Sequence, residues 1–186
     1  RVLFRSPMTD AIVSDRGAKR WTTGHPWIYR SDVREHPPEA GVVAVRDGRG
    51  RFLGRALCSP SSEIRLRLLE RRDVPIDGGW WRERLTECRD QRLGLDASAW
   101  RAVHAEGDGL PALIVDRYDR WLVVQLLSAG LETQRAMIVE ALREVFQPEG
   151  ILLRHDVPTR RLEGLDDRVE LAMGTSCRRR IPSGWN

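Results

Sequence analysis

The sequence predicts an α+β protein of two units, a small β-barrel followed by a compact unit of helices and strands. Three observations predict this fold class. Short alternating apolar segments crowd residues 8–72, a break rich in Pro and Gly stands at 73–79, and helical and strand patterns alternate over 80–172. A chain of 186 residues, 41% hydrophobic and 31% charged, is also long enough to bury a core.

The first unit is built from four or five short strands. Strands are expected at "AIVSD", at "HPWIYRSDV", on both sides of the turn in "GVVAVRDGRGRFLGRALC", and at "IRLRLL". Between the first two, "RGAKRWTTG" predicts a helical turn or loop with a basic face. In the last strand, alternation places Ile64, Leu66 and Leu68 on one face and Arg65 and Arg67 on the other.

The second unit has the order helix, three strands, helix, strand. A helix over "WWRERLTECRDQRLGL" should end near Gly94, and "WRAVHAE" follows as a strand. The runs "ALIVDRY" and "WLVVQLL" flank a tight turn at Asp119 and Arg120. A second helix is expected over 131–146, then a strand at "GILLRHD" and a charged loop or short helix at "VPTRRLEGL".

Charge is unevenly distributed along the chain. Residues 8–72 carry a net charge of +5, whereas residues 73–172 carry −6. Lys19 is the only lysine, so nearly all the positive charge is arginine, whose planar guanidinium binds phosphate with two hydrogen bonds and stacks on bases. The basic first unit is therefore the expected site of contact with a polyanion.

Several functional classes find no support in the composition. No apolar run reaches the roughly 18 residues of a membrane span, and no signal peptide precedes the first unit, so we expect a cytoplasmic protein without membrane contact. The three cysteines are odd in number and widely spaced, which favours reduced, buried thiols. They are Cys58, Cys88 and Cys177. The four histidines are too scattered for a metal motif, and no metal is expected.

The segment "AKRWTTGHPWIYR" mixes positive charge with aromatic rings. Looped or single-stranded RNA is bound by this combination, because phosphates attract the charges and bases stack on the rings. Alternatively, Trp27 and Tyr29 belong to the core of the barrel and the charges are a solvated rim, and composition favours neither interpretation. The candidate RNA-binding residues are Lys19, Arg20, His25, Trp27, Arg30, Arg65 and Arg67.

The stretch "GDGLPALIVDRYDRW" holds several carboxylates that could form an acid and base pair. They are Glu106, Asp108, Asp116 and Asp119. Asp beside Gly is also the ordinary composition of a turn, because Asp bonds its own backbone, and this interpretation is favoured over a hydrolase site. The strand "ALIVD" is followed by another strand and not by a glycine-rich turn into a helix, so it does not form a nucleotide site.

Four longer segments resemble a known family. They are "GHPWIYRSDV", "GRFLGRALCSPSSEIRLRLL", "AEGDGLPALIVDRYDRWLVVQLLSAG" and "LRHDVPTRRLEGL". They are similar, in unbroken order over residues 11–171, to the N-terminal half of the bacterial class I large-subunit rRNA methyltransferases that methylate cytosine C5. The resemblance implies a PUA-like RNA-binding domain at 8–72, an α+β linker domain at 80–172, and rRNA as the partner.

In that family a Rossmann-like domain follows, which binds S-adenosylmethionine and carries the catalytic cysteine. Here the sequence turns into "MGTSCRRRIPSGWN", so Cys177 is given no catalytic role. The expectation is a truncated, inactive chain without the methyltransferase domain, with no catalytic residue and no cofactor of its own. Residues 1–7 and 173–186 are expected to be non-native or disordered tails. The alternative is a freestanding PUA-type RNA-binding adaptor.

Overall fold

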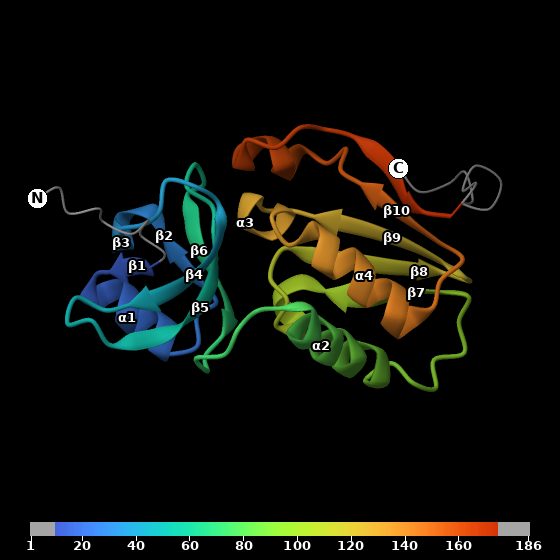
Figure 1. Ribbon diagram of the computed structural model, residues 1–186, viewed down its shortest axis with the longest axis horizontal. Helices are drawn as coiled ribbons and strands as arrows, with labels where there is room; N and C mark the ends of the chain where they lie inside the picture. Colours follow the sequence, from blue (N-terminus) through green and yellow to red (C-terminus); the bar gives the residue numbers. More distant parts are fainter. Residues whose placement is uncertain (1–9, 175–186) are drawn as a thin grey trace, which may run out of the picture. The chain divides into compact units, whose positions relative to one another are not determined.

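The computed structural model describes residues 10–174, which fall into two units (Figure 1). Within these residues, the first unit comprises the chain up to Pro75 together with Ser128–Gln134 and Leu162–Leu165. The second comprises Ile76–Leu127, Arg135–Arg161 and the chain from Asp166. The first unit is thus completed by two short segments that come much later in the sequence. Predictions that fall on residues 1–9 and 175–186, including Cys177, lie outside the described residues.

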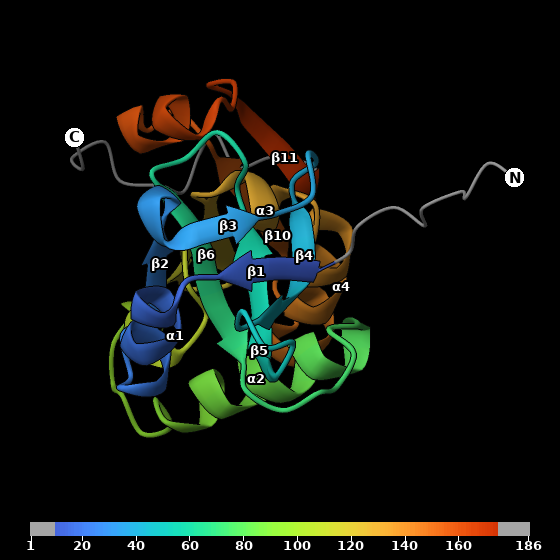
Figure 2. The same ribbon diagram turned by 90° about the vertical axis from the view of Figure 1, so that its left-hand side faces the viewer.

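The first unit holds one six-stranded sheet and the helix α1 (Figure 2). Its strands are β1 (Asp10–Val13), β2 (Trp27–Tyr29), β3 (Val33–Glu35), β4 (Gly41–Arg46), β5 (Phe52–Cys58) and β6 (Ile64–Glu70). They lie in the order β2-β6-β5-β4-β1-β3, with β1 and β4 parallel. Among the described residues the two end strands do not pair with each other, so hydrogen bonding does not close the expected barrel.

Helix α1 (Asp15–Thr22) forms where only a helical turn or loop was expected. The Ser14 hydroxyl caps it by accepting a bond from the Gly17 N–H at 3.1 Å. Trp21 from the same helix is fully buried, and its indole N–H donates to the Leu53 carbonyl at 3.1 Å. The helix is therefore fixed to β5 by its one large apolar side chain.

The predicted strand "HPWIYRSDV" is interrupted in the structure. It is divided into β2 and β3 by a 3-10 turn at Arg30–Asp32. The two strands lie at opposite ends of the sheet order, because β2 pairs with β6 while β3 pairs with β1. The hairpin of β4 and β5 around the DGRG turn is confirmed.

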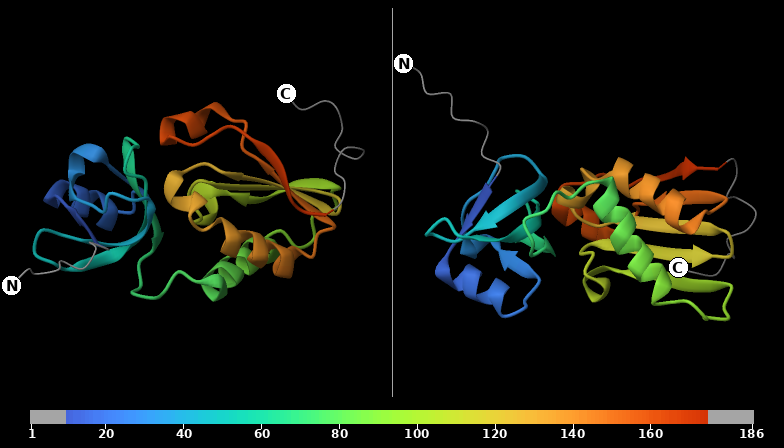
Figure 3. Two further views of the ribbon diagram at one scale, coloured as in Figure 1. Left: turned by 45° about the horizontal axis from the view of Figure 1, so that its top comes forward. Right: turned by 60° about the horizontal axis from the view of Figure 1, so that its bottom comes forward.

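The second unit is a five-stranded sheet with two long helices (Figures 1 and 3). The strands are β7 (Ala99–His104), β8 (Leu113–Tyr118), β9 (Trp121–Leu126), β10 (Gly150–Arg154) and β11 (Val169–Met173), in the order β11-β10-β9-β8-β7. All neighbours are antiparallel except β9 and β10. The helices α2 (Gly78–Asp90) and α4 (Arg135–Phe146) pack against each other on the same face of this sheet (Figure 3).

Two helical features and one strand depart from the sequence prediction. Helix α2 ends at Asp90, four residues before Gly94, and the Arg92 guanidinium donates to the Cys88 carbonyl at 2.9 Å. The helix expected over 131–146 is two helices, α3 (Ala129–Glu132) and α4. The short helical turn at Pro158–Glu163 agrees with the charged loop or short helix expected at "VPTRRLEGL". Strand β11 was not predicted at all, because its exposed residues give no clear alternation.

Candidate nucleic-acid interface

One edge of the first unit gathers a guanidinium and three aromatic rings. Arg20 comes from the last turn of α1, and its guanidinium carbon lies 5.0 Å from the centre of the Tyr29 ring. The ring centre of His25 lies 6.0 Å from that of Trp27 and 6.2 Å from that of Tyr29. All four side chains are partly exposed. We call these four residues, Arg20, His25, Trp27 and Tyr29, the aromatic edge.

Asp32 supports the base of the aromatic edge. Its carboxylate is 2% exposed, and one oxygen accepts bonds from Arg16 Nε at 2.6 Å and from the Ser14 hydroxyl at 3.2 Å. The other oxygen lies 3.8 Å from the Arg20 guanidinium. The Arg20 guanidinium therefore has the buried Asp32 carboxylate on one side and the Tyr29 ring on the other. These two contacts restrict its position.

The other flank of α1 faces a hollow of about 290 Å³. Lys19 from the helix and Arg49 and Arg51 from the β4–β5 turn supply its positive charge. Asp47 holds the turn together, because it accepts bonds from the Arg49 and Arg51 backbone and from Arg51 Nε at 2.7 Å. The bond from the Arg51 side chain lowers the pKa of Asp47. We call Lys19, Arg49 and Arg51 the basic hollow, which Asp15, Ala18, Thr22, Asp47 and Leu53 also line.

The structure brings together some of the predicted RNA-binding residues. Arg20, His25 and Trp27 meet in the aromatic edge, while Lys19 lies on the opposite flank of α1 in the basic hollow. Arg30 is exposed and lies 3.8 Å from the exposed Glu63 carboxylate. Sequence reasoning missed Arg49 and Arg51, although the DGRG turn that carries them was quoted as a hairpin signal.

Arg65 and Arg67 are buried, with 5% and 6% of each residue exposed. Arg67 donates to Glu163 at 2.7 Å, and Glu163 also accepts a bond from the Ser62 hydroxyl at 2.6 Å. The expectation that these two arginines are available to RNA is therefore wrong in this structure. Alternation correctly separated them from Leu66, but the face they occupy is covered by other segments of the first unit.

The pKa of Glu163 reflects this environment. Burial opposes the charged form, but Arg67 together with the hydroxyls of Ser62 and Ser59 outweighs burial and lowers the pKa. The second oxygen of Glu163 accepts a bond from the Ala129 N–H at 3.2 Å. This carboxylate thus ties β6 to the start of α3 within the first unit.

Neither described cysteine fits a thiolate nucleophile. Cys58 is fully buried and Cys88 is 3% exposed, as expected for structural thiols. Burial raises the pKa of each thiol to about 11, so both are protonated at neutral pH.

Strands β9 and β10 are parallel, and α3 and α4 connect them. In open sheets with parallel strands, cofactors bind near the carboxyl ends of the strands, which here is the turn after β9. The N–H groups of this turn already have partners. Gly130 donates to Ser59 Oγ at 3.3 Å, and Leu131 donates to Ser128 Oγ at 3.2 Å. A Cβ on Gly130 would lie 2.8 Å from the Cys58 carbonyl oxygen. The turn is filled by packing against β5 and does not fit S-adenosylmethionine.

Two of the four carboxylates that could form an acid and base pair are paired with arginines. Asp108 accepts from Arg92 at 2.7 Å and Asp116 from Arg101 at 2.8 Å. Asp119 occupies a left-handed turn position at φ 53°, as the turn interpretation requires, and Glu106 lies in a short 3-10 turn. Within residues 10–174, no group of three or more His, Cys, Asp or Glu side chains could hold a metal ion. In the same part of the chain, no helix has both the length and the apolar content of a membrane span.

Comparison with known proteins first defines a class. Residues 11–71 match the family model of a PUA-like domain.

The curated relatives point to a more specific class of protein than the domain match does. A ribosomal RNA large subunit methyltransferase I from Vibrio cholerae is 37% identical over 177 residues, covering 90% of this chain and 44% of the relative. The protein of the same name from Tolumonas auensis is 40% identical over 158 residues, covering 81% of this chain and 40% of the relative. These matches support the resemblance to large-subunit rRNA methyltransferases, and their names do not specify the methylated base. The chain spans less than half the length of these relatives.

Solved structures show the fold. The chain described as "a putative SAM-dependent methyltransferase from Streptococcus mutans" matches 91% of this chain and 44% of its own, with a TM-score of 0.75 and 18% identity. A second methyltransferase structure, complexed with SAH, covers 79% of this chain with a TM-score of 0.72 and 19% identity.

These structures correct the predicted fold class. The predicted fold class, a PUA-like barrel and an α+β linker domain with the methyltransferase domain absent, is contradicted, because chains described as methyltransferases match 91% and 79% of this chain in fold. The PUA-like part of that prediction agrees with the family model that matches residues 11–71. The expectation of a truncated chain without a catalytic domain is likewise not supported.

Proposed function

We propose that this chain binds rRNA for an S-adenosylmethionine-dependent large-subunit rRNA methyltransferase. One observation carries the proposal, namely that basic side chains lie on one flank of helix α1 and a guanidinium with aromatic rings on the other. The basic hollow would hold backbone phosphates, and the aromatic edge would stack an unpaired base. The names of the curated relatives and the PUA-like match of residues 11–71 support rRNA as the ligand.

The proposed contact residues follow from accessibility. They are Lys19, Arg20, His25, Trp27, Arg30, Arg49 and Arg51, all at least partly exposed. Arg65 and Arg67 are left out because they are buried. Methyl transfer to cytosine C5 is the finer part of the proposal and rests on the family resemblance alone. Because bacterial rRNA is modified where ribosomes are assembled, the proposal also implies a cytoplasmic location.

The test of RNA binding is a salt titration of affinity for fragments of large-subunit rRNA. Each phosphate contact contributes about 0.7 to 0.9 to the slope of log K against log salt. Replacing Lys19 or Arg49 by Gln should lower the slope by about that amount, and Trp27→Leu should weaken binding about ten-fold with little change in slope. Arg82→Gln on α2 is the matched control, because Arg82 is an exposed arginine of the second unit.

Two results would contradict the proposal. One is rRNA affinity that does not depend on salt, and the other is equal loss of affinity in Lys19→Gln and Arg82→Gln. Methylation of cytosine is tested separately, by mass spectrometry of rRNA from cells with and without the gene. Unchanged cytosine methylation would remove the finer claim only.

A further inference from the structure

Arg20 of the aromatic edge is restrained on two sides, yet its hydrogen-bond donors are unused. Its guanidinium carbon lies 5.0 Å from the centre of the Tyr29 ring, and one terminal nitrogen lies 3.8 Å from an Asp32 carboxylate oxygen. Within residues 10–174, none of the guanidinium N–H groups of Arg20 donates a hydrogen bond. The side chain is 32% exposed, so these donors are accessible to a ligand.

Asp32 does not cancel the positive charge of Arg20. Its single negative charge faces two guanidiniums, and Arg16 is the nearer one, with Nε bonded to a carboxylate oxygen at 2.6 Å. The other oxygen, which faces Arg20, accepts no hydrogen bond from the described residues. Two arginines and one aspartate leave this group with an excess of one positive charge. Arg20 therefore remains able to attract an acceptor from a ligand.

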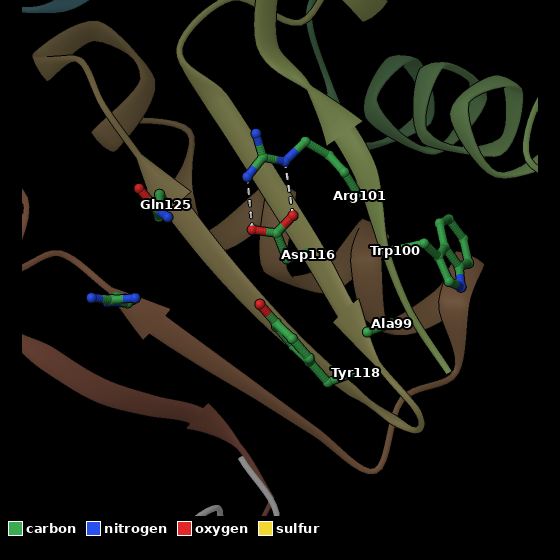
Figure 4. A pocket seen from close by; sticks show the side chains of 7 residues that line it. Ala99, Trp100, Arg101, Asp116, Tyr118 and Gln125 are labelled. Atoms are coloured by element: carbon green, nitrogen blue, oxygen red, sulfur yellow. Dashed lines mark hydrogen bonds and ion pairs between the residues drawn. The ribbon is translucent and has the colours of Figure 1, made fainter. Parts of the chain in front are cut away.

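Arg101 of the second unit shows the opposite arrangement (Figure 4). It lines a cavity of about 480 Å³ together with Asp116. Arg101 donates to Asp116 through Nε at 2.8 Å and through one terminal nitrogen at 3.1 Å. A carboxylate of the protein thus occupies one edge of this guanidinium and balances its charge. Arg20 makes no such two-bond pair in the described part of the chain, so its planar edge is available for two parallel hydrogen bonds.

The surroundings of Arg20 favour a nucleobase over an isolated phosphate. The centre of the His25 ring lies 6.0 Å from that of Trp27 and 6.2 Å from that of Tyr29, and all three side chains are partly exposed. A planar base can stack on such rings while its edge bonds to a guanidinium, whereas a phosphate gains nothing from them. The net charge of +5 over residues 8–72 attracts the phosphates on either side of that base.

The donors of Arg20 distinguish between the four bases. A guanidinium offers parallel N–H donors and no acceptor. Guanine presents two adjacent acceptors, O6 and N7, on an edge that is free in a single strand. Adenine has an amino donor beside N7, and uracil has a donor beside each acceptor, so both would place a donor against the guanidinium. Cytosine has adjacent acceptors at O2 and N3, but the ribose lies next to O2 and crowds that approach.

We infer that Arg20 recognises an unpaired guanine in the bound RNA. O6 and N7 of the base accept two hydrogen bonds from the guanidinium, and the rings of the aromatic edge contact the face of the base. The choice of RNA as the ligand rests on the proposed function, whereas the choice of guanine rests on the contacts of Arg20. Base preference and overall RNA affinity can therefore be measured separately.

The test measures binding of the full chain to short fluorescent oligouridines that differ only in the central nucleotide. The oligonucleotide with a central guanine should bind about ten-fold more tightly than those with adenine, cytosine or uracil. Replacing this guanine by 7-deazaguanine, which lacks the N7 acceptor, should abolish the preference. Hypoxanthine, which keeps O6 and N7 but lacks the amino group, should bind as guanine does.

Arg20→Lys tests the residue itself. Lysine keeps the positive charge but has no planar pair of donors, so the guanine preference should fall to less than about two-fold while the salt slope stays unchanged. Arg46→Lys on β4 is the matched control. Arg46 is 36% exposed, is paired with Asp10 at 2.7 Å and lies 5.9 Å from the Phe52 ring centre. This variant should keep both the guanine preference and the salt slope.

The outcomes separate this inference from the proposed function. If RNA binds with the expected salt dependence and Trp27→Leu weakens binding, but guanine is not the preferred base, the inference is overturned and the proposed function stands. A guanine preference that persists with 7-deazaguanine or in Arg20→Lys also overturns the inference, because another group then recognises the base. RNA affinity that does not depend on salt would contradict the proposed function, and the inference with it.

Discussion

At the scale of single residues, Glu163 shows how a buried charge is supplied with partners. Its carboxylate accepts bonds from Arg67, Ser62 and the Ala129 N–H, so both oxygens are occupied. Removing one partner of a buried ion pair is costly because the other charge stays buried and uncompensated. Arg67 would be that charge, since only 8% of its side chain is exposed.

We predict that Glu163→Gln lowers the free energy of unfolding by about 3 kcal/mol. Urea denaturation followed by circular dichroism measures it. The control is Glu140→Gln, which breaks an exposed pair with Arg143 and should change the free energy by less than about 0.5 kcal/mol. Equal effects of the two substitutions would show that the Arg67–Glu163 pair has no special importance.

The pH dependence of stability follows from the lowered pKa of Glu163. A carboxylate with a lower pKa in the folded state stabilises the fold above its unfolded pKa, and this contribution disappears as pH falls through the folded pKa. The ordinary glutamate value is 4.5, so the loss occurs below it. The stability difference between the natural chain and Glu163→Gln should therefore narrow as the pH falls from 7 to about 3. A difference that is constant or widens over this range would contradict the assignment.

The same residues show what the sequence could and could not predict of the site. Lys19, Arg20, His25 and Trp27 lie in one short segment, and local pattern was enough to select them as candidates. Arg65 and Arg67 were misplaced because alternation gives the face of a strand but not what covers it. The residues that cover this face, such as Glu163 and Gly130, come from distant parts of the chain.

At the scale of elements, strong local signals succeeded and weak ones failed. The β4–β5 and β8–β9 hairpins were predicted, because Asp and Gly turns between apolar runs are specific signals. The single helix expected over 131–146 is interrupted, and at the break the Thr133 hydroxyl donates to the Gly130 carbonyl at 2.7 Å. Apolar spacing continues through that break, so periodicity alone could not reveal it.

Gly130 in α3 gives a prediction at this scale. An alanine there would bring its Cβ within 2.8 Å of the Cys58 carbonyl oxygen and 3.0 Å of the Cys58 nitrogen, both backbone atoms. Gly130→Ala should destabilise the protein by about 1 to 3 kcal/mol despite the better helix propensity of alanine. Gly78→Ala at the start of α2 is the matched control, because no atom lies within 4 Å of its added Cβ, and it should be neutral or slightly stabilising. Thermal unfolding measures the stability of both variants. A stabilised Gly130→Ala would show that α3 does not pack closely on β5.

At the scale of the whole molecule, the first unit is assembled from three separate stretches of chain. Sequence analysis expected it to end near residue 72, whereas Ser128–Gln134 and Leu162–Leu165 also belong to it. Such an arrangement could not be inferred from composition, because these stretches are too short to carry a pattern of their own.

A chain that ends at Pro75 should therefore fold poorly. It would lack α3 and Glu163, which cover the buried Arg67 and the backbone around Cys58. We expect a broad, non-cooperative thermal transition and fast amide hydrogen exchange in β5 and β6 for this shortened chain. The same measurements on the full chain with Glu163→Gln serve as the comparison for the shortened chain. A cooperative transition at the temperature of the full chain would refute the requirement for the later segments.

The discontinuous first unit also has a consequence for synthesis on the ribosome. Translation proceeds at about 5 to 20 residues per second, so several seconds separate the emergence of β6 from that of Glu163. During this interval Arg67 lacks its counter-ion Glu163, and the surface that α3 later covers remains exposed to solvent. The first unit is thus begun first but completed only after Leu165 has left the exit tunnel.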